Sequence, residues 1–132
     1  MASAFKAPPG RCTASAGAAH AWAVENPDKV SCVYAENPIL RSHMSGAQPL
    51  DRLDVLAKAR VPVLHVCVSR DPWLDSQTRV LEKRYKELGG AVTVIVEDAK
   101  GHFPIAPRDV KPVVDFIVDR QSDARGQNST KP

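Results

Sequence analysis

The sequence has little of several features that mark particular classes of protein. Its three cysteines are widely spaced and form no CxxC pair, so neither a disulfide framework nor a zinc site with the histidines is predicted. No apolar run approaches the roughly twenty residues of a membrane-spanning helix. The net charge of +3, with acidic and basic residues interleaved, is too small to indicate a nucleic-acid partner. No glycine-rich phosphate loop joins a strand to a helix, which disfavours a nucleotide-binding domain.

The overall amino-acid composition is that of an ordinary globular protein. Apolar residues make up 43% and charged residues 25% of the 132 residues, which predicts one folded domain. A signal peptide is not predicted, because residues 8–11, Pro-Pro-Gly-Arg, interrupt the apolar stretch near the amino terminus. We therefore expect a cytoplasmic protein without a membrane partner. Cys32 and Cys67 lie inside apolar runs and are predicted to be small buried thiols.

Strand and helix patterns alternate along the chain. Short apolar segments predict buried strands, and amphipathic segments predict helices. Ser76 is expected to cap the third of these helices, and the neighbouring Asp75 stands at the start of the same helix. The strands are expected over 30–34, 61–68 and 91–96, and the helices over 13–25, 50–59, 76–88 and a last segment with Pro112 in its first turn. No strand is predicted in residues 1–11.

This order predicts the α/β class, with parallel strands joined by helices. All three strands look buried on both faces, so they need further neighbours. We therefore expect a partial domain over residues 1–121 that lacks the amino-terminal half of its sheet, followed by a disordered polar tail over 122–132. An unpaired apolar strand edge would favour self-association.

Candidate chemistry lies where two neighbouring strands end. Asp71 follows the strand at 61–68, and His102, preceded by a glycine, follows the strand at 91–96. The carboxyl ends of parallel strands meet at one edge of a sheet, so this carboxylate could orient this imidazole. Asp75 is a rival acid, although a position at a helix start favours capping. His65 is predicted to pack in the core, and His20 and His43 show no partner pattern.

The same segments resemble the carboxyl-terminal half of an α/β-hydrolase, most closely bacterial esterase-like or peptidase-like enzymes. The resemblance covers residues 11–120 and is carried by NPDKVSCVYAENP, PLDRLDVLAKARVPVLHV, SRDPWLDSQT and LEKRYKELGGAVTVIVEDAKGHFPIAP. In that family the acid of the catalytic triad follows the seventh strand and the histidine follows the eighth. The resemblance thus implies Asp71 as triad acid and His102 as general base, with an ester or amide substrate and no cofactor or metal.

The nucleophile departs from the family pattern. The segment GRCTASAGAAH holds Ser15 in half of the G-x-S-x-G motif, but Thr13 stands where the first glycine belongs. Counting back from Trp22 without gaps places Thr13 at the nucleophile position, beside Cys12. We therefore expect a serine-type hydrolase in which Ser15 is the candidate nucleophile. We expect the chain alone to be weakly active or inactive. The alternative is a non-catalytic α/β module whose partner supplies the missing strands.

Overall fold

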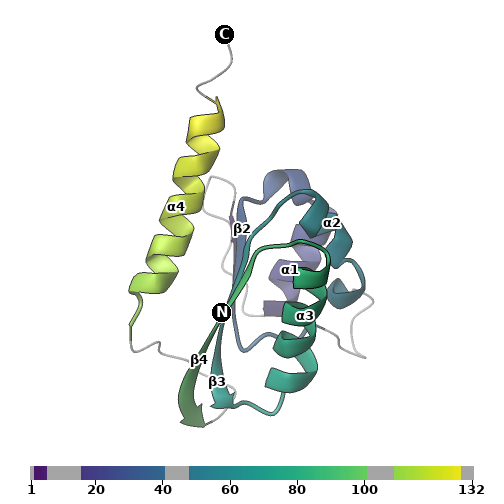
Figure 1. The fold of residues 1–132 in the computed structure, drawn as a ribbon, viewed down its shortest axis with the longest axis vertical. Helices are drawn as coiled ribbons and strands as arrows, with labels where there is room; N and C mark the ends of the chain where they lie inside the picture. Colours follow the sequence, from purple (N-terminus) through teal and green to yellow (C-terminus); the bar gives the residue numbers. More distant parts are fainter. Residues whose placement is uncertain (1, 6–15, 41–47, 101–108, 129–132) are drawn as a thin grey trace.

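A four-stranded sheet forms the centre of the fold (Figure 1). The computed structural model describes residues 2–5, 16–40, 48–100 and 109–128. In spatial order the strands are β1 (Ala2–Phe5), β2 (Cys32–Glu36), β3 (Val63–Arg70) and β4 (Val92–Lys100). β2, β3 and β4 run parallel, whereas β1 pairs antiparallel with β2. The predicted α/β class, with parallel strands joined by helices, is confirmed.

Helices cover both faces of the sheet (Figure 1). On one face lie α1 (Ala16–Glu25), α2 (Leu53–Lys58) and α3 (Arg79–Glu87), and on the other lies α4 (Lys111–Asn128). Three shorter helical turns complete the described elements: the 3₁₀ turns η1 (Pro27–Lys29) and η2 (Pro49–Asp51), and the π-helix η3 (Leu74–Thr78). As predicted, Pro112 stands in the first turn of the last helix, where its missing N–H costs nothing.

The core is split between the two faces because successive side chains of a strand point in opposite directions. Val63 belongs to the larger cluster, which includes Leu56 of α2 and Leu81 of α3. Its neighbour Leu64 belongs to a smaller cluster, against which Phe116 of α4 packs. β3 is buried from Val63 to Val68, which explains its continuous apolar sequence. Cys32 and Cys67 are buried thiols, as predicted.

Three expectations about the ends of the chain and the edge of the sheet were wrong. β1 exists although no strand was predicted in residues 1–11. It is only four residues long and lies at the sheet edge, where backbone pairing rather than an apolar pattern defines a strand. β4 was expected to be fully buried, but Thr93 and Val96 are exposed, since β4 pairs on one side only. Finally, α4 continues to Asn128, so the tail expected from Ser122 is helical there. Its Gln, Asp, Ala and Arg residues are acceptable in a helix.

The predicted elements otherwise differ from the observed ones mainly at their ends. Each of the three predicted strands is present, but begins one or two residues later than its apolar segment and extends into polar residues such as Ser69 and Arg70. The segment predicted as one helix over 50–59 divides into η2 and α2. No helix in the described part of the chain is long and apolar enough to cross a membrane.

Candidate functional site

The two strands that precede the segments singled out by the sequence end side by side at the carboxyl edge of the sheet. Arg70, the last residue of β3, pairs with Lys100, the last residue of β4. Asp71 follows Arg70 directly, and His102 comes two positions after Lys100. His102 itself lies outside the described residues. The register nevertheless ends β3 and β4 at paired positions, after a register shift between Val68 and Arg70.

The ends of β3 and β4 are also linked by polar side chains. The Ser69 hydroxyl donates a hydrogen bond to Oδ1 of Asp98 at 3.0 Å, and the Arg70 guanidinium lies 3.7 Å from the same oxygen. These side chains are exposed, so the ion pair contributes little stability, on the order of 0.5 kcal/mol. Their effect is local, because they hold the two strand ends together directly before the segments that carry Asp71 and His102.

Asp71 occupies a tight turn between β3 and η3. Its side chain is nearly buried, with 6% exposed, and its Oδ1 accepts a hydrogen bond from the backbone N–H of Trp73 at 3.1 Å. The Asp71 carbonyl in turn accepts from the Leu74 N–H at 3.2 Å. Asp71 therefore forms a side-chain-to-backbone turn directly before the helical segment, and this contact fixes the position of the carboxylate.

The capping role expected for Ser76 was wrong. The helical segment begins at Leu74, two residues earlier than predicted, so Ser76 lies within η3 and is exposed. Its hydroxyl points back to the Trp73 carbonyl at 3.5 Å. Asp75, the rival acid, is exposed as well. Of the two acids considered, only Asp71 is buried at the sheet edge.

Buried polar side chains attach η3 to β3 and to the segment that follows β2. Gln77 Oε1 accepts a hydrogen bond from the Leu40 N–H at 2.9 Å. The Thr78 hydroxyl lies 3.0 Å from Nδ1 of His65 and 3.3 Å from Sγ of Cys67, both on β3. Burial raises the pKa of the Cys67 thiol, although the Thr78 contact opposes that rise. These contacts keep the segment that begins at Asp71 in a defined position over β3.

A pair of buried histidines extends this network to α1. Nε2 of His65 lies 3.1 Å from Nε2 of His20, with the rings edge to face, and both side chains are fully buried. Burial lowers the pKa of His65 well below the usual 6.5, and the neighbouring His20 lowers it further. His65 is thus neutral near neutral pH. The expected core position of His65 is confirmed, but sequence reasoning missed its pairing with His20.

Asn37 closes the carboxyl end of β2. Its backbone is in the left-handed region, with φ of 41°, a conformation that asparagine tolerates better than most residues. Its side-chain Oδ1 accepts the Val68 N–H at 3.0 Å, and its own N–H donates to the Val66 carbonyl at 3.0 Å. The asparagine thereby continues the pairing of β2 with β3 after β2 has ended.

The amino end of α1 lies at this same edge. Ala19 packs against Ala35 near the end of β2, and α1 then leads through η1 into the start of β2. α1 is therefore antiparallel to β2, and its first residue, Ala16, lies towards the carboxyl edge. Ser15 immediately precedes Ala16 in the sequence, but Ser15, Thr13 and Cys12 all lie outside the described residues. His43 lies outside them as well.

Within the described ranges, no three histidine, cysteine, aspartate or glutamate residues form a group that could hold a metal ion. No protein-family model, curated protein or solved structure matches the chain.

Proposed function

We propose that the chain is a serine-type hydrolase of the α/β-hydrolase kind that cleaves ester or amide bonds. In this proposal Asp71 orients His102, His102 is the general base, and Ser15 is the nucleophile. The observation that supports the proposal is the pairing of Arg70 with Lys100, since the acid segment and the histidine segment follow these two residues directly in the sequence. A ligand site outside the carboxyl ends of parallel strands is the usual arrangement in open α/β sheets.

Two further features support the assignment. Asp71 is nearly buried, as a carboxylate that must hold an imidazole in one orientation should be. The chain order Ser15, Asp71, His102 is also that of the α/β-hydrolases.

The proposed reaction proceeds through an acyl-enzyme. The Ser15 hydroxyl oxygen attacks the carbonyl carbon of the substrate, and its proton passes to the His102 imidazole. As the tetrahedral intermediate collapses, the bond to the alcohol or amine breaks, and His102 protonates that leaving group. Water then attacks the acyl-enzyme by the same route and releases the acid. We expect weak turnover, because Thr13 replaces the first glycine of the nucleophile motif.

The alternative is a non-catalytic module completed by strands of a partner. In the described conformation β1 occupies the outer edge of β2, which is where a preceding strand of a larger sheet would pair. A partner would therefore have to displace β1 or join the sheet elsewhere. The strand before the nucleophile of a complete hydrolase sheet would pair with the same edge of β2, so the position of β1 does not separate the two functions.

A fluorophosphonate probe separates the two functions, because it modifies only an activated hydroxyl nucleophile. We expect slow labelling that peptide mapping assigns to Ser15. Labelling should disappear in Ser15→Ala and in His102→Ala, and it should persist in the matched control Ser76→Ala, which removes an exposed hydroxyl of η3. Absence of labelling, or labelling that is indifferent to His102→Ala, would support the module. Loss of labelling in Thr13→Ala alone would move the nucleophile to Thr13.

A further inference from the structure

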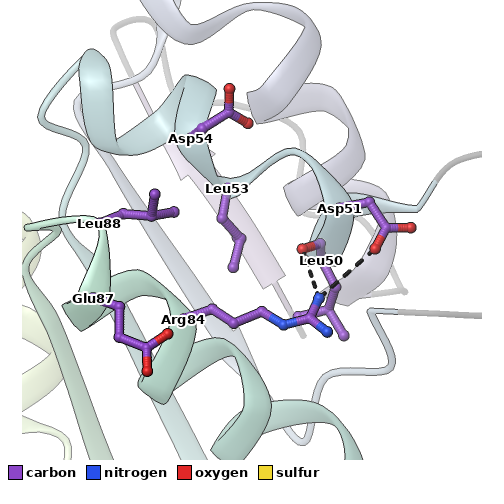
Figure 2. Close-up of a pocket in the computed structure, with 7 residues that line it drawn as sticks. All are labelled: Leu50, Asp51, Leu53, Asp54, Arg84, Glu87 and Leu88. Carbon is purple, nitrogen blue, oxygen red and sulfur yellow. Dashed lines mark hydrogen bonds and ion pairs between the residues drawn. The ribbon is translucent and has the colours of Figure 1, made fainter.

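A pocket lies between η2 and α2 on one side and the carboxyl-terminal end of α3 on the other (Figure 2). Its volume of about 340 Å³ is at the lower end of the range for small-molecule sites. α3 continues through Gly89 and Gly90 into the start of β4, so the pocket lies towards the amino edge of the sheet. It is separate from Asp71, so a ligand bound in it would be independent of the proposed hydrolase.

The interior of the pocket is apolar. Leu53 forms a buried wall, while Leu88 is 48% exposed although it is a large apolar side chain. Figure 2 shows both leucines extending into the same space. The Arg84 guanidinium donates to the Leu50 carbonyl at 3.2 Å and lies 3.7 Å from Asp51. Because its charged end is held in this way, Arg84 presents its hydrocarbon stem to the pocket.

The rim of the pocket is negatively charged. Asp51, Asp54 and Glu87 line it, with Arg84 as the cation, and Arg84 is paired with Asp51. Within the described part of the chain, neither Asp54 nor Glu87 takes part in an ion pair, and Figure 2 shows their carboxyl groups on either side of the leucines. Glu87 is the last residue of α3, where the helix dipole adds further negative potential.

We propose that this pocket binds an alkylammonium ligand, a hydrocarbon chain that ends in a positively charged amine. The hydrocarbon fits the surface of Leu53 and Leu88, and its burial supplies most of the affinity. The ammonium group remains near water at the rim, where Asp54 and Glu87 supply negative charge. A lysine side chain is often arranged in the same way, with its hydrocarbon stem buried and its amine solvated. An anion of equal length is repelled by both carboxylates.

Octylammonium is a suitable probe, and amide NMR shifts of the whole chain report where it binds. We expect saturable binding with a dissociation constant on the order of 1 mM, as a ligand of this size in an open pocket allows. The largest shifts should cluster at residues 53–54 and 84–88. The double variant Asp54→Asn/Glu87→Gln should weaken binding about three- to tenfold, which is the range for two exposed charge contacts. Leu88→Ala should weaken it as well.

Matched controls make the result specific. Asp75→Asn removes an exposed carboxylate from η3, and Val118→Ala shortens an exposed apolar side chain on α4; neither should change the affinity. All substituted side chains are exposed, and unchanged far-UV circular dichroism would confirm that each variant folds. Equal affinity for octanoate or 1-octanol would overturn the proposal. So would shifts that cluster elsewhere, a double variant that binds like the wild type, or no saturable binding.

Discussion

The buried contact between His20 and His65 makes the stability of the fold depend on pH. Their Nε2 atoms lie 3.1 Å apart, so one ring donates a hydrogen bond and the other must accept it. Burial keeps the pKa of His65 well below 6.5 in the folded protein, whereas unfolding returns it to about that value. The unfolded chain therefore binds more protons than the folded chain as the pH falls below 6.5.

The sign and size of the effect follow from linkage. A lowered pKa in the folded state means that the stability is fully present above pH 6.5 and is lost as the pH falls towards the folded pKa. The slope for one such group is about 1.4 kcal/mol per pH unit. Acidification from pH 8 to pH 5 should thus cost up to about 2 kcal/mol from His65 alone. That is a large part of the roughly 5–15 kcal/mol of a typical domain.

Urea denaturation at pH 8 and pH 5 measures this cost. His65→Gln removes the titrating ring, so its loss of stability between the two pH values should be smaller than that of the wild type, by up to about 2 kcal/mol. Val63→Ala, a buried change on the same strand, is the matched control for destabilisation without loss of a titrating group. Its pH dependence should equal that of the wild type. Equal losses in wild type and His65→Gln would refute the reasoning.

Packing, the buried network and the proposed chemistry each give one more expected outcome. A Cβ on Gly90 would lie 2.5 Å from the Tyr85 ring, so Gly90→Ala should lower the free energy of unfolding by about 1–3 kcal/mol in urea denaturation; an unchanged midpoint would contradict this. Thr78→Val leaves Nδ1 of the buried His65 without its partner and should lower the free energy of unfolding by about 1–3 kcal/mol. Thr78→Ser keeps the hydroxyl and should retain most of that stability. Equal losses in the two variants would count against the hydrogen bond. The chain alone should hydrolyse an activated aryl ester slowly and without a burst. A fast reaction abolished by Ser15→Ala would show a complete catalytic apparatus.

The fold class could be predicted from sequence because β3 and its neighbours carry strong apolar patterns. The nearly continuous apolar run from Val63 to Val68 is typical of a strand covered on both faces. β1 could not be predicted, since it is defined by backbone pairing with β2 and its four residues carry no distinctive pattern. The extension of α4 past Ser122 was missed for a related reason, because polar composition alone does not separate an exposed helix from a disordered tail.

The candidate site could be predicted only where titratable residues follow the ends of strands. Asp71 was found because it follows a strand, and its position beside the end of β4 follows from parallel topology. The pairing of His20 with His65 could not be found, since the two residues are 45 positions apart and meet only through the packing of α1 against the sheet. The one local signal was a histidine and a cysteine, His65 and Cys67, on the same face of a strand that is otherwise apolar.

The central claim is that Asp71 and His102 act as a pair, and an NMR titration of the His102 imidazole tests it most directly. A carboxylate within about 4–6 Å raises a histidine pKa by roughly one unit or more. We therefore expect Asp71→Asn to lower the pKa of His102 by about one unit, while the matched variant Asp75→Asn leaves it unchanged. A His102 pKa that is the same in the wild type and in Asp71→Asn would contradict the pairing and with it the proposed hydrolase.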